Sequence, residues 1–568
     1  MTTQTAVRRK KKNRKPENVF PKLNARTVLI ILFALAFVFR LFLVKYRFAI
    51  AFDEVNYLKL GVSGYLTGFS AVLHTYWSPL LPALISIFCV FLDDYVFAGR
   101  MISMIAGSLL VIPVYFLGKY VYDKWVGLLA AGIVAFFPPL AFQSTQVLTE
   151  PIYMLLATCA VLFGLRMVHR YSTGFALLAG LVAALAYLAH PQGIGFFLVL
   201  AFWIVFGAVS KLFLIRPLRM VYLLSSFLFG FLIAAAPYLW YLKKTTGHWT
   251  FSAKASANLQ MAAPQQGEGD PFRSLDSNNQ SVPIDQIFHQ GNFLQSTRGG
   301  SKPVREVRLG RVLFKYVKNL TNVLASAIPP LLTTVPLILL AIGLLGSEWQ
   351  PGKGKMIFYL LSFVGFFWFI LIPSFHINLR YFSPLWPVCS LWMAKGVVNL
   401  QEWLSLNMSV RKRAKKMGLS PAVLSAVFIL TTVLALGFMP EFGRVLARTP
   451  DNGDYWADPV EQKKAGLWLK ENTTGPRIIM SRGHAVDIYA GNYDITQSVT
   501  LPKASLERVL EYAKYRNVDY LVVNERYIKS YPEMNVLLET RDNISGLELI
   551  YDERDVSGLA TKIYQVLK

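Results

Sequence analysis

Apolar residues come in long blocks separated by short charged breaks over the first three quarters of the chain. The blocks are about 17–25 residues long, which is the length that a helix needs to cross a membrane. They predict eleven spans, near residues 27–45, 98–118, 125–142, 151–168, 173–189, 193–210, 220–240, 328–346, 356–373, 381–399 and 421–440. The block 79–92 is shorter and carries Pro79 and Pro82. We therefore expect it to be partly embedded or interfacial rather than a span.

The charged breaks fix the expected orientation. Basic residues concentrate in the breaks 1–26, 119–124, 166–172, 211–219, 347–355 and 400–420. Acidic residues lie in the alternate breaks, at Asp53, Glu54, Asp93, Asp94 and Glu150. Lysine and arginine mark the cytoplasmic loops of membrane proteins. The pattern predicts a cytoplasmic N-terminus and, after eleven spans, a C-terminus on the opposite side.

Two large segments are expected outside the membrane. Residues 243–326, rich in Gln, Ser, Asn and Gly, form a loop with a predicted interfacial helix at 308–326. Residues 441–568 alternate predicted helices (459–472, 503–516) with strand runs (RIIMS, VDYLVVN, LELIY, TKIYQVL), a pattern typical of a small α/β domain. The predicted fold is a polytopic α-helical membrane protein with a basic tail (1–26), a membrane module (27–440, first outside loop 46–97) and this extracytoplasmic domain.

Composition narrows the class of protein. The chain of 568 residues is 54% hydrophobic and 16% charged, with a net charge of +25. Much of that charge lies in two clusters beside predicted spans, Arg8, Arg9, Lys10, Lys11, Lys12, Arg14 and Lys15, and Arg411, Lys412, Arg413, Lys415 and Lys416. Positive-inside topology and anionic lipid headgroups account for such clusters, so no nucleic-acid partner is expected. Cys89, Cys159 and Cys389 lie in apolar stretches and predict packing thiols rather than a disulfide framework.

The candidate chemistry lies on the outside face. Charged residues at membrane level are costly and are functional candidates. Asp53 and Glu54 directly follow the first span, with Tyr57 and Lys59 after them, and Glu150 opens the fourth span in LTEP. A solvated loop start is the alternative interpretation of the Asp53–Glu54 pair, because span ends are commonly polar.

Further polar and aromatic residues are predicted on the same face. They are His74 and Trp77 in LHTYWSPLLP, Arg100 at the start of the second span, His190 in YLAHPQG, and His376, Arg380 and Tyr381 in HINLRYFSPLWP. Together they supply a carboxylate to take a proton, cations for a phosphate and aromatic walls for a sugar. The histidines stand singly without metal-ligand spacing, so no metal site is predicted and no cofactor is required, with a divalent ion left open.

The order of these features resembles the GT-C superfamily of membrane glycosyltransferases. Within it, the chain is similar to the protein mannosyltransferase-like branch that includes aminoarabinose transferases. The resemblance rests on the basic tail, Asp53-Glu54, SPLLP, LTEP, the turn after the fifth span, Arg380-Tyr381, and KKAGLWLKENT with VDYLVVN in the C-terminal domain. The chain departs from many relatives at His190-Pro191-Gln192, where they have arginine and glutamate. It also departs at Trp77-Ser78-Pro79, where they have a His-Pro-Pro-like step.

The resemblance implies a polyprenyl-phosphate sugar donor, extracytoplasmic transfer and inversion at the anomeric carbon. It implies that Asp53 activates or orients the acceptor and that Glu150 is a second essential acid. Arg100, Arg380, Tyr381, Tyr57 and Lys59 are candidates for donor binding, and His74, Trp77, His190 and His376 for sugar or acceptor contacts.

The acceptor stays open between a lipid, a glycan and a protein, and a bacterial inner membrane fits the resemblance. A transporter or lipid flippase that relays protons through the same acids is the alternative function. An envelope scaffold acting through the C-terminal domain is a third. That domain is expected to serve recognition or support rather than catalysis, because its runs show no glycine-rich phosphate loop and no converging acid–base set.

Overall fold

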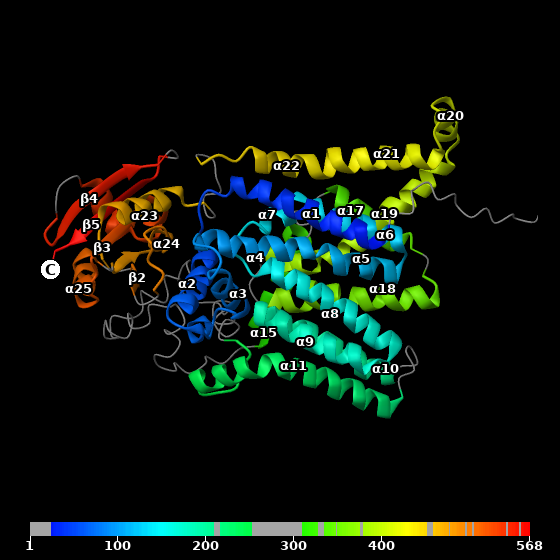
Figure 1. Cartoon of the computed structure of the whole chain (residues 1–568), viewed down its shortest axis with the longest axis horizontal. Helices are drawn as coiled ribbons and strands as arrows, with labels where there is room; N and C mark the ends of the chain where they lie inside the picture. The colour runs from blue at the N-terminus through cyan, green and yellow to red at the C-terminus, as the bar shows by residue number, and fades with distance from the viewer. Residues whose placement is uncertain are drawn as a thin grey trace, which may run out of the picture.

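Long helices run side by side in a bundle, and a small α/β domain lies at one end of it (Figure 1). The structure is a computed structural model. It describes residues 24–209, 216–252, 309–327, 334–347, 349–374, 379–450, 458–475, 477–494, 497–501, 505–540, 544–555 and 558–567. The helical bundle and the small domain confirm the outline of the predicted fold, a helical membrane module followed by a C-terminal α/β domain.

A helix lies at each of the predicted apolar blocks. The bundle contains α1 (Ala25–Leu43), α4 (Tyr95–Leu109), α5 (Val111–Val121), α6 (Lys124–Phe136), α7 (Pro138–Gln143), α8 (Glu150–Arg170), α9 (Thr173–Ala189), α10 (Ile194–Val209), α11 (Pro217–Thr246), α17 (Thr334–Leu345), α18 (Pro351–Val364), α19 (Trp386–Leu406), α21 (Pro421–Val433) and α22 (Met439–Leu446). Within the described residues, 6 helical stretches are long and apolar enough to cross a membrane by length and composition. Eleven crossings therefore stay a prediction.

Local sequence explains where these helices begin and how closely they pack. The side chains of Asp94, Asp123 and Ser172 accept hydrogen bonds from the first backbone N–H groups of α4, α6 and α9. A Cβ atom on Gly343 of α17 would lie 1.7 Å from the Trp392 carbonyl oxygen of α19. Glycine at this position therefore allows the two backbones to approach, as at many membrane helix contacts.

The first loop folds into two helices at the end of the bundle that faces the α/β domain (Figure 1). These are α2 (Asp53–Leu66) and α3 (Leu80–Phe88). The predicted short element at 79–92 is thus a helix of 9 residues, too short to cross a membrane. Helix α2 packs mainly against α3, with further contacts to α4 and to α24 (Ala485–Tyr489) of the α/β domain, so the loop is a packed part of the protein.

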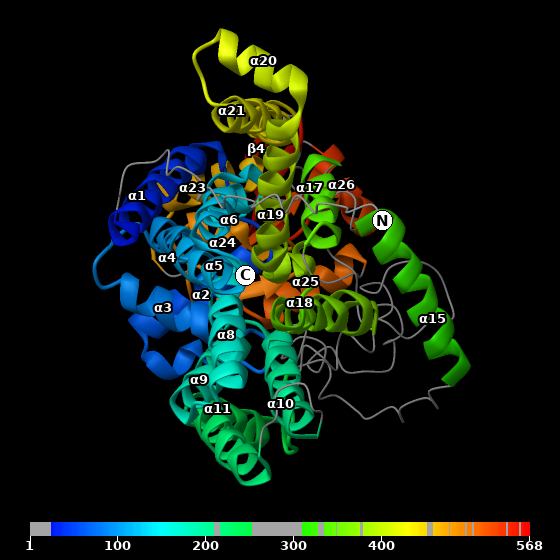
Figure 2. The same ribbon diagram turned by 90° about the vertical axis from the view of Figure 1, so that its right-hand side faces the viewer.

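The basic cluster of residues 411–416 lies at the opposite end of the bundle, on α20 (Met408–Lys416). Figures 1 and 2 show α20 projecting from the edge of the bundle that is opposite α11. Helix α15 (Leu309–Asn322) occupies the predicted helix at 308–326, and Asn319 Nδ2 donates to the Pro373 carbonyl at 2.9 Å. The rest of the predicted polar loop, residues 253–308, lies outside the described residues.

The C-terminal domain is a five-stranded mixed sheet in the order β2-β1-β3-β5-β4. Its elements are β1 (Ile479–Ser481), β2 (Ser498–Thr500), β3 (Tyr520–Asn524), β4 (Leu547–Arg554), β5 (Ala560–Val566), α23 (Val460–Asn472), α24 (Ala485–Tyr489), α25 (Leu506–Tyr515) and α26 (Asn535–Glu539). Strands β2, β1 and β3 are parallel, and β5 and β4 are antiparallel to their neighbours. The predicted helices and strand runs are all present, whereas β2 and α24 were not expected.

Alternation along the strands explains the two layers of this domain. On β3, Leu521 and Val523 pack into one core with α25, whereas Val522 packs into another with α23. Successive strand residues point to opposite faces of a sheet. Both faces of the sheet are therefore covered by helices.

Candidate active site at the end of the bundle

Asp53, Glu150 and Arg380 meet at one place although they come from three distant segments. Arg380 Nη2 forms an ion pair with Asp53 Oδ2, and Arg380 Nε lies 3.4 Å from Glu150 Oε1. The side chain of Glu150 is 5% exposed, whereas those of Asp53 and Arg380 are 22% and 29% exposed. The buried carboxylate of Glu150 therefore lies behind Arg380, whereas solvent reaches both Arg380 and Asp53.

The secondary structure explains how these residues converge. Asp53 is the first residue of α2 and Glu150 is the first residue of α8. Backbone N–H groups at a helix N-terminus favour a negative charge, so both positions suit carboxylates. Arg380 lies in the 3₁₀ turn Leu379–Leu385, which leads into α19. Three segment ends thus contribute the charged groups.

The charges of this cluster are strongly coupled. Burial lowers the pKa of Arg380, but the carboxylates of Glu150 and Asp53 more than offset this and raise it above its ordinary value. The guanidinium therefore stays charged. Glu150 Oε2 is buried and makes no hydrogen bond within the described part of the chain. A buried carboxylate oxygen without a partner is costly, which favours a further hydrogen-bond donor at this position.

Aromatic side chains surround the charged cluster. The Tyr57 hydroxyl hydrogen-bonds with the Thr149 side chain, and burial, followed by the nearby charges of Asp53 and Glu150, raises its pKa. Trp77 packs edge-on against Tyr57 at 5.1 Å between ring centroids. On the other side, Tyr381 lies 5.9 Å from the ring of His190. Of the predicted site residues, Tyr57, Tyr381, Trp77 and His190 are therefore gathered around Asp53, Glu150 and Arg380.

Comparison with solved structures identifies the fold. ArnT from Cupriavidus metallidurans bound to undecaprenyl phosphate superposes with a TM-score of 0.56 at 12% identity, over 95% of this chain and 98% of that one. Its apo form gives 0.54 at 10% identity over the same shares. The archaeal oligosaccharyltransferase AglB from Archaeoglobus fulgidus, in complex with an inhibitory peptide and a dolichol-phosphate, gives 0.51 at 13% identity, over 90% and 70% of the two chains. The chain has the GT-C fold.

A family match supports the same assignment. Residues 76–241 match the dolichyl-phosphate-mannose-protein mannosyltransferase family, and no curated protein matches the chain. The matched residues include Glu150, Trp77 and His190, but neither Asp53 nor Arg380. The resemblance to GT-C glycosyltransferases that the sequence suggested is confirmed.

Glu54 of α2 and Arg100 of α4 have hydrogen-bond partners outside the cluster of Asp53, Glu150 and Arg380. Glu54 Oε2 accepts from the Val147 N–H at 2.9 Å, and Arg100 Nη2 donates to the Ala49 carbonyl at 3.2 Å. Burial raises the pKa of Glu54, and the charge of Arg100 partly offsets this. In the structure, Glu54 thus holds the turn before α8, and Arg100 holds the segment before α2; their catalytic and donor-binding roles stay predictions.

Lys59 and His74 also lie away from this cluster. Lys59 Nζ is 2.5 Å from Asp487 Oδ2 in the C-terminal domain, so its charge is paired there, and donor binding by Lys59 stays a prediction. His74 Nδ1 accepts from the Tyr76 N–H at 3.0 Å, and burial lowers the pKa of His74 to about 4. His74 is therefore a neutral turn-forming residue. His376 lies outside the described residues.

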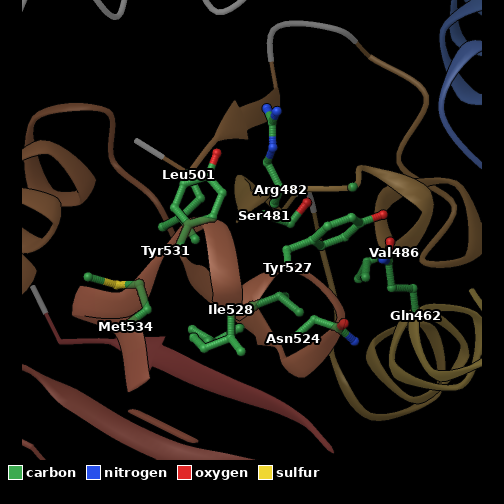
Figure 3. Close-up of a pocket in the computed structure, with 13 residues that line it drawn as sticks. Gln462, Ser481, Arg482, Val486, Leu501, Asn524, Tyr527, Ile528, Tyr531 and Met534 are labelled. Atoms are coloured by element: carbon green, nitrogen blue, oxygen red, sulfur yellow. The ribbon is translucent and has the colours of Figure 1, made fainter. Parts of the chain in front are cut away.

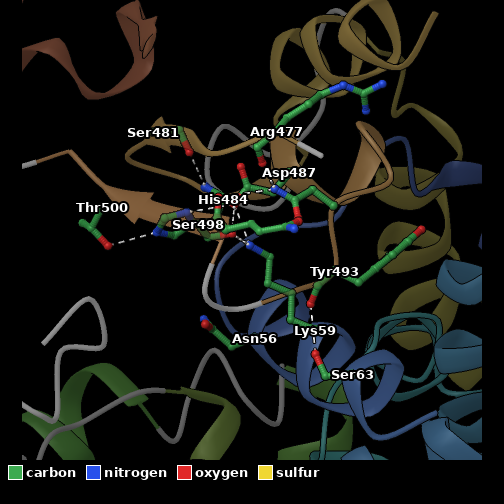
Figure 4. A network of polar contacts seen from close by, with 12 residues as sticks. Asn56, Lys59, Ser63, Arg477, Ser481, His484, Asp487, Tyr493, Ser498 and Thr500 are labelled. Carbon is green, nitrogen blue, oxygen red and sulfur yellow. Dashed lines mark hydrogen bonds and ion pairs between the residues drawn. The ribbon is translucent and has the colours of Figure 1, made fainter. Parts of the chain in front are cut away.

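The C-terminal domain of this GT-C protein contributes a polar network that sequence reasoning missed (Figure 4). His484 Nδ1 lies 3.1 Å from Asp487 Oδ2, and His484 Nε2 lies 3.1 Å from Thr500 Oγ1. Ser498 Oγ donates to the same Asp487 oxygen at 2.5 Å. The expectation that no acid–base set converges in this domain is therefore wrong. The sequence shows no motif around RGHAVD that would have revealed it.

A narrow pocket lies at the carboxyl ends of β1, β2 and β3 in the same domain (Figure 3). It is lined mainly by apolar side chains and by two tyrosines. The lining residues are Gln462, Ser481, Arg482, Gly483, Val486, Leu501, Val522, Val523, Asn524, Tyr527, Ile528, Tyr531 and Met534. In open α/β sheets ligands commonly bind at this edge, but here the space is small, and Tyr527 and Tyr531 form part of its wall.

No group of three or more metal-ligating side chains (His, Cys, Asp or Glu) occurs among the described residues. At the Asp53–Glu150 pair, the guanidinium of Arg380 lies between the two carboxylates. The positive charge between the two carboxylates is therefore that of Arg380.

Proposed function

We propose that the chain is a glycosyltransferase that moves a sugar from a polyprenyl-phosphate donor to an acceptor at the membrane face that bears the C-terminal domain. The observation that supports this most directly is the meeting of Asp53, Glu150 and Arg380 beside aromatic side chains. Two proteins of similar fold are described with a bound undecaprenyl phosphate and a dolichol-phosphate. Carboxylates, a guanidinium and aromatic rings are the groups that transfer from such a donor requires.

In the proposed reaction, an acceptor hydroxyl or amine attacks the anomeric carbon as the bond from that carbon to the phosphate oxygen breaks. The phosphate leaves with the electron pair and stays on its lipid. Asp53 takes the proton of the attacking group, which is the ordinary role of a general base. Attack from the face opposite the phosphate inverts the anomeric carbon.

Arg380 would stabilise the negative charge of the departing phosphate. Guanidinium groups bind phosphate oxygens well, and charge stabilisation in a partly buried site contributes strongly to catalysis. In the structure Arg380 Nη2 is paired with Asp53 and Arg380 Nε faces Glu150. A bound phosphate competes with Asp53 for the guanidinium, so donor binding releases the Asp53 carboxylate for the acceptor while Glu150 keeps Arg380 in place.

The proposal includes the orientation of the protein. The site and the C-terminal domain lie at one end of the bundle and the basic helix α20 at the other (Figure 1). With positive charge on the cytoplasmic side, eleven spans place the N-terminus in the cytoplasm and the site outside it, in a bacterial inner membrane. The acceptor is a lipid, a glycan or a protein of the cell envelope.

The test is transfer by the purified full-length chain in lipid nanodiscs. A panel of synthetic polyprenyl-phosphate sugars is supplied, and release of polyprenyl phosphate is measured with and without envelope extracts as acceptor. We expect slow hydrolysis of at least one donor, faster release with acceptor, and loss of both in Asp53→Asn. A chain that leaves every donor intact but moves the intact lipid across the bilayer of a proteoliposome would instead be a flippase.

A further inference from the structure

The C-terminal domain holds helix α2, which begins with Asp53, by a buried ion pair (Figure 4). Lys59 Nζ lies 2.5 Å from Asp487 Oδ2, and the side chains are 5% and 0% exposed. Lys59 also donates to Ser498 Oγ, which itself donates to Asp487. The Lys59 ammonium is thus held by Asp487 of α24 and by Ser498 of β2 together.

A second set of contacts holds the residues just before α2. The backbone N–H groups of Phe48 and Ala49 donate to Asp458 Oδ1 at 3.1 and 3.5 Å. The N–H of Ile50 donates to the Tyr489 hydroxyl at 3.0 Å. The C-terminal domain thus fixes the backbone that enters α2.

Phe52, directly before Asp53, has a backbone conformation that depends on such support. Its φ of 46° is in the left-handed region, which a bulky L-residue rarely adopts unless the surrounding structure imposes it. Its ring packs edge-on against Tyr527 of the C-terminal domain, with 6.4 Å between centroids. The direction in which Asp53 leaves the chain is therefore set partly by this domain.

Helix geometry shows what these contacts do for Asp53. Lys59 follows Asp53 by six residues, which corresponds to about 9 Å along the helix and roughly 240° around it. The two side chains consequently point to different sides of α2. On one side of α2, Asp53 pairs with Arg380 of the membrane bundle. On the other side, Lys59 pairs with Asp487 of the C-terminal domain. The helix is held between the membrane bundle and the C-terminal domain.

We propose that Lys59 and Asp487 are positioning residues, which set the placement of the Asp53 carboxylate in the active site. The proposal rests on the glycosyl transfer proposed above. A reacting group displaced by about 1 Å can lose on the order of 10²-fold in rate. The ion pair therefore affects the turnover number more than donor affinity, because it touches neither the donor phosphate nor Arg380.

The test separates positioning from stability. Removing one partner leaves a buried charge alone and destabilises the protein, whereas removing both charges together often leaves stability nearly unchanged. The informative variant is therefore Lys59→Met with Asp487→Asn, compared with each single substitution. We expect the double variant to keep its thermal unfolding temperature while kcat falls about 10- to 100-fold and the donor KM stays within about twofold.

The matched control is an exposed ion pair of the same domain, Lys464 with Glu553, whose side chains are 39% and 46% exposed. Lys464→Met with Glu553→Gln should leave kcat, KM and thermal unfolding unchanged. A double variant of Lys59 and Asp487 with wild-type kcat would overturn the proposal.

A measurement without substrate distinguishes this proposal from the proposed function. Spin labels are placed at Leu66, the exposed last residue of α2, and at Gln565, exposed on β5. We expect a narrow distance distribution in the wild-type background and a broad one in the Lys59→Met, Asp487→Asn background. An unchanged distribution would refute the positioning role even if the chain transfers sugar. Absence of transfer by the wild type would refute the proposed function while leaving the distance measurement valid.

Discussion

Arg380 and Asp53 form an ion pair across 327 residues of sequence. The same guanidinium faces Glu150, so one cation joins the ends of α2 and α8 and the turn before α19. Both carboxylates share the charge of Arg380. Substitution of any one is expected to change the reaction in a different way.

Asp53→Asn should abolish most of the turnover. The amide keeps the shape of the side chain but cannot take a proton, and a general base is typically worth ~10²–10⁴-fold in rate. We therefore expect kcat to fall by at least about 100-fold, while donor affinity does not fall, because the amide competes less than the carboxylate for Arg380. Turnover in membranes, normalised to the amount of folded protein, measures this. Near-normal turnover would remove Asp53 from the role of base and turn attention to Glu150.

Arg380→Lys should separate charge from geometry. Lysine keeps the positive charge but offers a point charge in place of the planar guanidinium that reaches two carboxylates. Loss of one stabilising donor typically costs ~10²–10³-fold, so we expect Arg380→Ala to lose that much and Arg380→Lys to lose less. The measurement is kcat and KM for the same donor. Equal activity of both variants and the wild type would show that the phosphate is bound elsewhere.

Glu54→Gln should affect stability more than turnover. Glu54 is 3% exposed and accepts the Val147 N–H, and a buried hydrogen bond to a charged group is worth about 1.5–3 kcal/mol. We expect a lower thermal unfolding temperature and a kcat within a few-fold of the wild type. The adjacent substitution Asp53→Asn is the comparison, because it should lower kcat strongly and change the thermal unfolding temperature little.

The stability of the C-terminal domain should fall below about pH 6.5. Burial lowers the pKa of His484, although the hydrogen bond with Asp487 opposes this. An unfolded histidine titrates near pH 6.5, so below that value the unfolded state binds a proton that the folded state does not. Stability is then lost as the pH falls. Thermal unfolding from pH 8 to pH 5 should show this loss, and His484→Gln should reduce its slope.

Labelling from the two sides of the membrane should reveal the orientation. In a background without native cysteines, Val536→Cys in the C-terminal domain should react with a membrane-impermeant reagent in intact cells. Met408→Cys on α20 should react only after the membrane is opened. Both side chains are well exposed, at 45% and 67%. Reaction of both from the same side would exclude the eleven-span arrangement.

The sequence was most informative where a repeating pattern determines structure. Apolar blocks of membrane length predicted the bundle helices, and runs such as VDYLVVN predicted β3, because burial on both faces requires continuous apolar residues. The order of the predicted spans also placed Asp53, Glu150 and Arg380 on the same face of the membrane. Their direct contact, by contrast, depends on how three segment ends fold in space.

Neighbouring residues show where sequence reasoning reached its limit. Asp53 and Glu54 are indistinguishable as sequence, yet helix α2 directs one to Arg380 and the other to the Val147 N–H. The partner of Lys59 lies 428 residues away in a segment without a recognisable motif. Such pairings follow from tertiary packing, which no local pattern encodes.

The contacts of Asp458, Asp487 and Tyr489 with the first loop have a consequence for biogenesis. A ribosome makes residues 48–59 early and these three partners near the end of synthesis, and domains fold as they emerge. The nascent loop therefore cannot acquire its final conformation until translation is almost complete. Premature release of the chain before residue 458 would leave a helical bundle in which α2 lacks the partners that hold it, so a truncated product would lack the assembled Asp53 site.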